Sequence, residues 1–189
     1  MNRAIFFDKD GVLNEDTDIK LQLKVTPYAY AGDTIVYFRS QGFKIFVISN
    51  QPIVARGLVT EKQLLEHLAE FQKNILRQKP GAKIDKIYYC PHHPDATLEK
   101  YRVSCECRKP RPGMLVRAAR EFEIELKESC MVGDRVSDIM AGKLAGCSTV
   151  LCMTGKHLEK MIRTDLKYPA EPEADFKVKD ITGLKDIIK

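Results

Sequence analysis

The sequence has no apolar run close to the roughly 20 residues that a helix needs to cross a bilayer. Its first residues, MNRAIFFDKDG, also lack the apolar stretch and the small-residue cleavage site of a secretory signal peptide. These two absences predict a cytoplasmic protein without a membrane partner. Cysteines stay reduced in that compartment, so Cys130, Cys147 and Cys152 are expected to be buried thiols and not halves of disulfides.

Tryptophan is absent, and the net charge of +5 is spread along the chain without a concentrated basic block. A groove for single-stranded nucleic acid combines clustered cations with aromatic side chains on which bases stack. The scattered charge and the missing tryptophan argue against such a groove, so nucleic acid is not an expected partner. The modest positive charge is compatible with a small anionic substrate.

Internal repeats, low-complexity runs and linkers are absent as well, which predicts that residues 1–189 form a single domain with an ample core. Short apolar runs alternate with segments of helical periodicity. This alternation predicts an α/β fold, a Rossmann-like parallel sheet flanked by helices on both faces. The predicted strands cover residues 3–7, 43–48, 84–89, 129–132, 149–153 and, more weakly, 174–178. The predicted helices cover residues 33–41, 60–79, 112–122, 136–144 and 183–189, and the predicted connections include 15–34 and 169–172.

Half of the six cysteines and half of the four histidines lie in one stretch, residues 90–107, which we call the metal loop. Its ligand pairs, Cys90-x-His92 and Cys105-x-Cys107, are separated by twelve residues. Two short pairs joined by a loop are typical of a four-coordinate zinc site, with His93 as the weaker choice of histidine. Tetrahedral thiolate sites accept iron as well as zinc, so the identity of the metal stays open.

Polar side chains follow four of the predicted strands. Parallel strands deliver their carboxyl ends to one edge of a sheet, so these side chains are expected to converge. Crowded carboxylates repel each other unless a divalent cation lies among them, and oxygen ligands suit Mg²⁺. A lysine and a hydroxyl nearby can hold phosphoryl oxygens, so the pattern predicts magnesium-dependent phosphoryl transfer. The side chains concerned are Asp8, Asp10, Ser49, Asn50, Arg108, Lys109, Asp134 and Asp138.

A plainer interpretation is open for the first pair, because Asp-Gly is common in turns and Asp8 and Asp10 can simply end a strand. The recurrence of Gly-Asp at 133–134, after another apolar strand, favours the catalytic interpretation. Lys9 lies between the two aspartates and alternates away from them on an extended chain. We therefore expect Lys9 to face solvent or to be paired.

Four segments, FFDKDGVLN, VISNQ, RKP and MVGDRVSDI, resemble in order and spacing the four motifs of the haloacid dehalogenase superfamily of phosphatases. The Cys-x-His…Cys-x-Cys pattern and CRKPRPGM are similar to the branch that contains heptose-bisphosphate and histidinol-phosphate phosphatases. The resemblance extends over about residues 4–155 and implies a haloacid dehalogenase-like fold with a zinc-binding loop. The segments between motifs are too short for a large cap domain, so an open site is expected.

The resemblance also implies a role for each matching residue. Asp8 matches the nucleophile that forms an aspartyl-phosphate, and Asp10 matches the general acid and base. Asp8, Asp134 and the main-chain carbonyl of Asp10 match the Mg²⁺ ligands. Ser49 and Lys109 match the groups that bind the transferring phosphoryl oxygens.

Two further sets of positions match substrate-binding and zinc-binding residues of the family. The substrate-binding matches are Asn50, Gln51, Arg56, Arg108 and Arg135. The zinc-binding matches are Cys90, His92, Cys105 and Cys107. Four protein ligands leave no open position on the metal, so the zinc is expected to be structural.

The resemblance implies removal of the 7-phosphate of a small phosphorylated sugar, D-glycero-D-manno-heptose 1,7-bisphosphate, in activated-heptose biosynthesis, and we expect a monomer. Two departures from the family pattern lie in loops at the rim of the site. Residues 15–34 lack a Gly-Tyr pair, and Pro52 stands where many members have a small residue. Histidinol phosphate therefore stays open as the substrate, as does either heptose anomer and, less strongly, a 3′-phosphorylated nucleic-acid end. A vestigial binding module is disfavoured because every expected catalytic position is filled.

Overall fold

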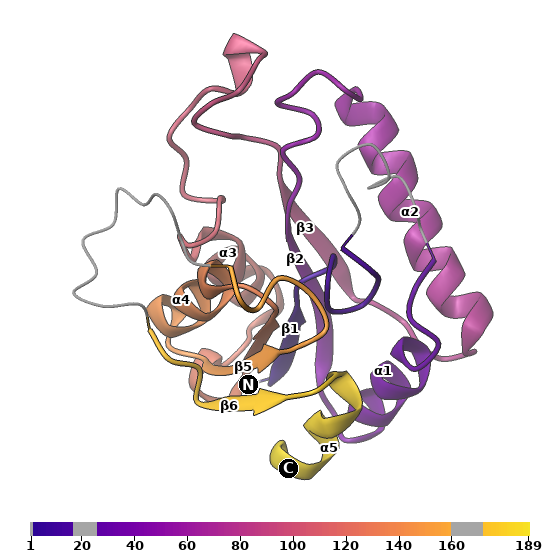
Figure 1. The fold of residues 1–189 in the computed structure, drawn as a ribbon. Helices are drawn as coiled ribbons and strands as arrows, with labels where there is room; N and C mark the ends of the chain where they lie inside the picture. Colours follow the sequence, from indigo (N-terminus) through magenta and orange to yellow (C-terminus); the bar gives the residue numbers. More distant parts are fainter. Residues whose placement is uncertain (1, 17–25, 160–171) are drawn as a thin grey trace.

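The computed structural model describes residues 2–16, 26–159 and 172–189. Six parallel strands form one sheet in the order β3-β2-β1-β4-β5-β6 (Figure 1). The chain builds outward from β1 to β3 and then crosses to β4 on the other side of β1, and α/β sheets bind ligands at such a switch point. The strands are β1 Ala4–Phe7, β2 Lys44–Asn50, β3 Lys86–Cys90, β4 Cys130–Gly133, β5 Ser148–Cys152 and β6 Phe176–Val178.

Helices cover both faces of this sheet. Successive residues of β1 point to opposite faces, so Phe7 packs in a core with α1, α2 and α5, while Phe6 packs in a second core with α3 and α4 (Figure 1). A parallel sheet buried on both faces is the predicted architecture, and the structure confirms it. The helices are α1 Ala31–Ser40, α2 Glu61–Gln78, α3 Gly113–Phe122, α4 Val136–Ala145 and α5 Leu184–Ile187.

The long helix α2 shows how local sequence positions an element. The Thr60 hydroxyl accepts a hydrogen bond from the Gln63 backbone, and the Gln63 side chain accepts one from the Thr60 backbone, which completes a capping box. Apolar residues then recur at helical spacing on one buried face. Those buried residues are Leu64, Leu68, Phe71 and Ile75.

All predicted strands and helices are present, with ends that shift by a few residues. The largest difference is at the last helix, where a 3₁₀ turn, Ile181–Gly183, precedes the single α-helical turn of α5. The predicted loop 15–34 already contains the start of α1, and its residues 17–25 lie outside the described residues. The predicted connection 169–172 also lies almost wholly outside them. Within the described part of the chain, no helix has both the length and the apolar character that crossing a membrane requires.

The metal loop extends beyond the carboxyl end of β3 (Figure 1). A small third core holds it against residues 51–59 and the start of α2, with Tyr101 and Ala55 among its buried members. Glu61 accepts hydrogen bonds from the hydroxyl groups of Tyr89, at 2.8 Å, and Tyr101, at 3.3 Å. The described residues between β1 and α3 form no cap domain, as predicted.

Candidate active site

The carboxyl ends of β1 and β4 bring three carboxylates together. Asp8 follows β1, Asp134 follows β4, and Asp138 lies in the first turn of α4. One oxygen from each of these residues lies within 4.8 Å of the others. Asp134 and Asp138 have no exposed surface, and Asp8 is 6% exposed. The strand ends therefore converge as the sequence predicts, and they concentrate negative charge in the interior.

Two glycines make room for Asp134. Gly11 has φ +87°, and a Cβ placed there would lie 2.4 Å from Asp134 Oδ2. A Cβ on Gly155, in the turn after β5, would lie 2.1 Å from the same oxygen. The backbone N–H of Lys156 donates to Asp134 Oδ2 at 2.6 Å and fixes the carboxylate in this space. The turn after β5, to which the sequence assigned no role, thus shapes the site.

Burial controls the electrostatics of these acids. It raises the pKa of Asp8 from 3.8 to about 7, although the adjacent Lys109 lowers it. Burial, followed by the charges of Asp138 and Asp8, raises the pKa of Asp134 to about 8. Asp134 Oδ1 has no hydrogen-bond partner among the described residues. A divalent cation bound beside this oxygen would relieve the repulsion and favour the ionised carboxylates.

Lys109 reaches into this acidic cluster from the segment that follows the metal loop. Its Nζ lies 2.8 Å from Asp8 Oδ1 and 2.6 Å from Asp138 Oδ1, and it donates to the Ile48 carbonyl at 2.8 Å. The side chain is 2% exposed. Burial alone lowers the pKa of Lys109, but the charges of Asp138 and Asp8 raise it above its usual value. The ammonium is therefore a fixed positive charge beside the predicted nucleophile.

Asn50 holds the backbone of Lys109. Its Nδ2 donates to the Lys109 carbonyl at 3.1 Å, and its Oδ1 accepts from the Lys109 N–H at 3.0 Å. The resemblance assigned Asn50 to substrate binding, but here both polar atoms of its amide are engaged with this one residue. The contact ties the end of β2 to the residue whose ammonium lies beside Asp8. Sequence reasoning had no signal for this pairing, because the two residues are far apart in the chain.

Ser49, Gln51 and Asp10 form a second polar group beside the carboxylates. Gln51 Nε2 donates to Ser49 Oγ at 2.8 Å and to Asp10 Oδ2 at 2.9 Å. Ser49 and Gln51 are almost fully buried, with 1% and 2% exposure. The carboxylate of Asp10 does not belong to the three-carboxylate cluster, which leaves its side chain available for a role other than binding a metal.

The predicted substrate-binding arginines are already partly engaged. Arg108 Nη1 donates to the His92 carbonyl at 2.9 Å, which links it to the metal loop. Burial lowers the pKa of Arg108, and the charge of Arg56 contributes in the same direction. Both side chains are only partly exposed. Two guanidinium groups within electrostatic range at the edge of the site make this region attractive to an anion.

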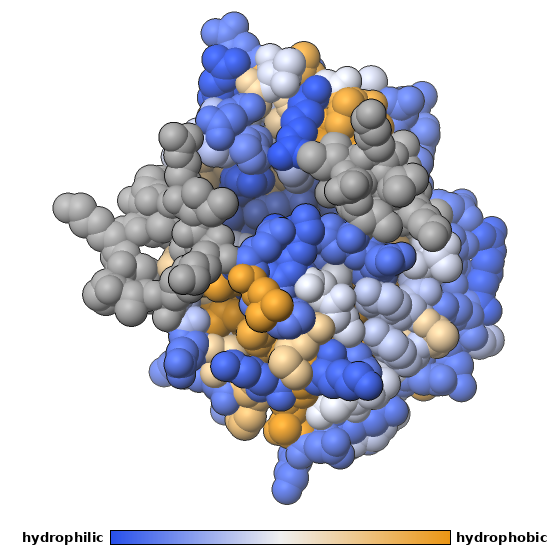
Figure 2. All heavy atoms as spheres, viewed as in Figure 1, coloured by the Kyte–Doolittle hydropathy of each residue, from blue (hydrophilic) through white to orange (hydrophobic). Residues whose placement is uncertain are grey.

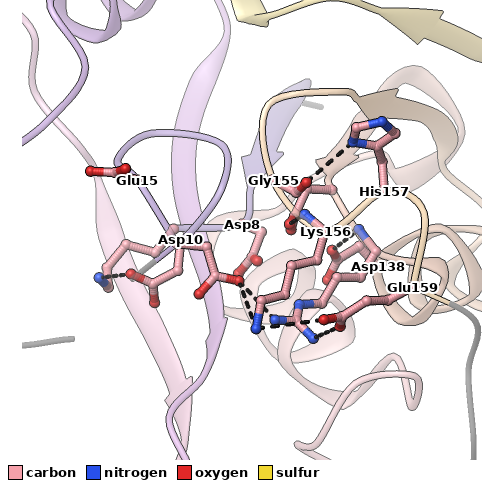
Figure 3. A network of polar contacts seen from close by, with 12 residues as sticks. Asp8, Asp10, Glu15, Asp138, Gly155, Lys156, His157 and Glu159 are labelled. Carbon is pink, nitrogen blue, oxygen red and sulfur yellow. Dashed lines mark hydrogen bonds and ion pairs between the residues drawn. The ribbon is translucent and has the colours of Figure 1, made fainter. Parts of the chain in front are cut away.

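Arg135 is the centre of an ion-pair cluster that sequence reasoning did not find. Its guanidinium lies 2.7 Å from Asp16 and 2.9 Å from Glu159. Lys156 lies 3.8 Å from Asp16 and 3.6 Å from Glu159. Figure 3 shows Lys156 and Glu159 on the same side of Asp8 as Asp138. The cluster links the loops after β1, β4 and β5 at the rim of the site.

Asp138 is an acid of the candidate site to which the resemblance assigned no role. The signal for it was present, because it stands four residues after Asp134 in the first turn of a predicted helix. Its Oδ2 accepts a hydrogen bond from the Arg135 backbone at 3.0 Å, which caps α4. Its Oδ1 faces Lys109. One carboxylate thus begins the helix and fixes the lysine.

The four predicted ligands of the metal loop lie together. Cys90, Cys105 and Cys107 have sulfur–sulfur distances of 3.0, 3.2 and 3.6 Å, and His92 Nδ1 lies 3.4 Å from Cys107 and 3.6 Å from Cys90. Zinc bonds of about 2.0–2.3 Å place tetrahedral ligands roughly 3.3–3.8 Å apart, so the cluster is close to the size of a zinc site. His93 lies outside it, and its Nδ1 accepts a hydrogen bond from the Asp95 backbone.

The protonation of this cluster also suits a metal. The hydrogen bond shared with Cys90 lowers the pKa of Cys107 to about 5, which favours a thiolate. The same contact, with burial, raises the pKa of Cys90. Without a cation, the crowded sulfurs of the cluster share protons. A bound metal ion would replace those protons, because cysteine binds a metal as the thiolate. The residues present therefore fit a structural metal ion.

The surface above the sheet is hydrophilic. Figure 2 shows hydrophilic residues gathered around a hollow in the upper middle of the face that it displays. The described residues place no cap over this part of the molecule.

Comparisons with known proteins agree with this geometry. A family model described as HAD-hydrolase-like matches residues 106–184. The D-glycero-beta-D-manno-heptose-1,7-bisphosphate 7-phosphatase of Photorhabdus laumondii is 37% identical over 188 residues, which are 98% of this chain and 95% of that protein. The D-glycero-alpha-D-manno-heptose-1,7-bisphosphate 7-phosphatase of the same organism is 38% identical over 147 residues, which are 76% of this chain and 78% of that protein.

Solved structures add a similar fold. The crystal structure of D,D-heptose 1,7-bisphosphate phosphatase from B. bronchiseptica, in complex with magnesium and phosphate, superposes with a TM-score of 0.77. The two chains are 27% identical, and the alignment covers 97% of this chain and 96% of that one. The alignment extends over nearly the whole chain, so it includes the strand ends that form the candidate site.

Proposed function

We propose that this chain, which belongs to the heptose-bisphosphate phosphatase branch of the haloacid dehalogenase superfamily, removes the 7-phosphate of D-glycero-D-manno-heptose 1,7-bisphosphate. The observation that carries the proposal is the buried pair of Asp8 and Lys109, held at 2.8 Å beside Asp134 and Asp138. A carboxylate nucleophile, a fixed cation and a cluster of acids that binds a metal ion are the parts that phosphoryl transfer needs. The place of the reaction is activated-heptose biosynthesis, and the cytoplasmic location and monomeric state stay predictions.

The first half of the reaction transfers the phosphoryl group to Asp8. A carboxylate oxygen of Asp8 forms a bond to phosphorus while the bond from phosphorus to the sugar oxygen at position 7 breaks. Asp10 gives its proton to that departing oxygen, so the heptose leaves as an alcohol. The product of this half is an aspartyl-phosphate at Asp8 and an ionised Asp10.

The second half returns the enzyme to its starting state. A water molecule attacks phosphorus and loses a proton to Asp10, and the bond between phosphorus and Asp8 breaks. Inorganic phosphate leaves, Asp8 is again a carboxylate, and Asp10 again carries the proton that the next cycle requires. The charge on the transferring oxygens is met throughout by the ammonium of Lys109 and the hydroxyl of Ser49.

The residues present fit magnesium at the strand ends. Asp8, Asp134 and the main-chain carbonyl of Asp10 are the proposed ligands, and Asp138 adds a third carboxylate nearby. The donor set consists of oxygens, and Asp134 Oδ1 is unpartnered among the described residues. When bound, the ion neutralises charge on the transferring phosphoryl group. In the metal loop, the proposed role of zinc is to hold the backbone that leads to Lys109.

Replacing Gly155 with alanine is expected to raise the Mg²⁺ concentration for half-maximal activity by about 10-fold or more, because the new Cβ displaces the carboxylate of Asp134. The measurement is a Mg²⁺ titration of the initial rate. Gly142→Ala is the matched control, since its Cβ would lie 2.7 Å from Met131 in the core and away from the acids. The control is expected to lower the unfolding temperature without changing the Mg²⁺ midpoint. Equal midpoints for Gly155→Ala and wild type would contradict the assigned role of Asp134.

The substrate proposal is tested by phosphate release with Mg²⁺. The panel contains both anomers of heptose 1,7-bisphosphate, histidinol phosphate and a 3′-phosphorylated oligonucleotide. We expect kcat/KM for the β anomer to exceed that for histidinol phosphate by about 100-fold or more. Phosphorus NMR should show that the 1-phosphate remains on the product. The β anomer is the expected choice because the relatives matched over 98% of this chain carry it in their names.

Two outcomes would change this conclusion. Preference for the α anomer keeps the enzyme class and changes the sugar, in line with the relative matched over 76% of the chain. Full activity on histidinol phosphate with none on either heptose overturns the substrate while it keeps the chemistry. The differences would then be sought in the rim, at Pro52 and in the loop after β1.

A further inference from the structure

The carboxylate of Asp10 is held by three neighbours. Its Oδ1 receives hydrogen bonds from Lys9 Nζ and, at 2.9 Å, from Asn14 Nδ2. Its Oδ2 receives one from Gln51 Nε2 at 2.9 Å. Asn14, Gln51 and Lys9 are all nearly fully buried. A side chain with three buried donors on its two oxygens has little freedom to rotate.

Lys9 is an unusual member of this group because it is a buried cation. It is 4% exposed, and its Nζ lies 5.4 Å from the centre of the Phe71 ring of α2. Burying an ammonium is costly unless it is paired and hydrogen-bonded. Ionised Asp10 neutralises the ammonium, and an oxygen of protonated Asp10 can still accept its hydrogen bond. The described residues offer one ion-pair partner within 4.0 Å, which is Asp10. The two side chains are therefore coupled, and neither can be placed without the other.

The turn after β1 creates this pairing. Gly11, with φ +87°, lets the chain reverse so that the N–H groups of Leu13 and Asn14 bond to the Lys9 carbonyl at 2.9 and 3.2 Å. Neighbouring residues on a straight strand point to opposite faces, but the reversal brings the side chains of Lys9 and Asp10 together. In Figure 3 the carboxylate of Asp10 lies on the side of Asp8 away from Asp138 and Lys156.

We propose that Lys9 is a positioning residue for the acid and base of the reaction, and that its buried ammonium sets where the Asp10 carboxyl group meets the sugar oxygen. The inference rests on the proposed function, and it extends that function to a side chain that does not touch the reacting atoms. Asn14 and Gln51 complete the support. Proton transfer requires hydrogen-bond reach in one geometry, so losing the cation turns Asp10 out of line.

The consequence depends on the leaving group. A sugar alkoxide needs a proton in order to leave, whereas p-nitrophenolate leaves as a stable anion without one. A variant with a misplaced Asp10 is thus impaired in forming the phosphoenzyme from a sugar phosphate and almost unimpaired in forming it from p-nitrophenyl phosphate. A variant with a damaged nucleophile site is impaired with both.

The test compares wild type with Lys9→Met, Lys9→Gln and Lys9→Arg on heptose bisphosphate and on p-nitrophenyl phosphate. For the two neutral variants we expect kcat on the sugar to fall by about 100-fold, with KM within about threefold of wild type. The rapid-mixing burst of p-nitrophenolate should keep its wild-type rate within about threefold. Lys9→Arg keeps the charge, and its kcat on the sugar is expected to be at least about 10-fold higher than that of the neutral variants.

Lys79→Met is the matched control. Lys79 also forms an ion pair with an aspartate, Asp33, at 2.7 Å, but on the surface and away from the site. Removing its charge is expected to leave the kcat on heptose bisphosphate and the burst rate with p-nitrophenyl phosphate unchanged. Thermal unfolding of each variant identifies any that fail to fold, and two neutral replacements of different polarity keep the comparison possible.

Three results would overturn the proposal. They are a fall in the p-nitrophenolate burst rate equal to the fall in kcat on the sugar, a loss confined to KM, or no loss in either neutral variant. Failure of the proposed function is visible separately, in the wild-type protein alone. If wild type hydrolyses p-nitrophenyl phosphate and histidinol phosphate but neither heptose, the sugar assignment fails. The Lys9 comparison is then decided on histidinol phosphate, whose alkoxide also needs a proton.

Discussion

Asp8→Asn is expected to lower kcat by about 10⁴-fold or more, because an amide cannot replace the carboxylate that attacks phosphorus. Acid quench of the wild-type reaction, followed by mass spectrometry, should find one phosphoryl group on the peptide that contains Asp8. The variant should show none. This effect should appear with every substrate, including p-nitrophenyl phosphate, since all of them pass through the same intermediate.

The same substitution should leave the fold intact. Burial already raises the pKa of Asp8 to about 7, so its ionised form is unfavourable in the metal-free interior. Asparagine has nearly the same shape and no charge, and Lys109 keeps Asp138 as its partner at 2.6 Å. The metal-free variant is therefore expected to unfold at or above the wild-type temperature near neutral pH. A phosphoenzyme formed at another residue, or activity within about 10-fold of wild type, would contradict the role of Asp8.

Cys107→Ala is expected to release the metal of the metal loop, to destabilise the protein by about 4 kcal/mol or more, and to lower activity by about 100-fold. For a chain of this length, that loss of stability corresponds to a fall in the unfolding temperature of about 10 °C. The activity falls because Arg108 and Lys109 follow Cys107 directly in the chain. A loosened loop no longer holds the Lys109 ammonium between Asp8 and Asp138.

Metal content, unfolding temperature and kcat should be measured on the same preparations. Cys147→Ala is the matched control, because Cys147 is a buried thiol that packs in the core with α3 and α4 and lies outside the metal cluster. It is expected to keep one equivalent of metal and nearly full kcat. If Cys107→Ala also kept its metal and its activity, the four-ligand site would be wrong. Metal analysis of wild type decides between zinc and iron.

The strands, the helices and most of the chemical groups could be predicted from local patterns. Apolar runs of strand length ended in Asp8 and in Gly-Asp at 133–134, and periodic apolar residues with a capping box marked α2. The paired spacing of the metal loop predicted the four side chains that the structure brings together. These signals are readable because hydrophobic periodicity and ligand spacing are properties of neighbouring residues. Parallel topology then brings the strand ends to one edge.

Other features were decided only when distant segments packed together. Lys9 became a buried partner of Asp10 because a turn at Gly11 and the ring of Phe71 enclose it. The side-chain amide of Asn50 forms two hydrogen bonds with the backbone of Lys109. Such pairings depend on which buried polar groups must satisfy one another, and burial is a property of the assembled core.

The sequence by itself therefore determined the fold class, the residue types at the strand ends and the composition of the metal loop. Only the tertiary structure decided the partners and orientation of those residues, such as Arg135 held by Asp16 and Glu159. The physical reason is that a motif specifies which functional groups are present over a few residues. The direction of each group, and the charge that it meets, follow from contacts between segments far apart in the chain.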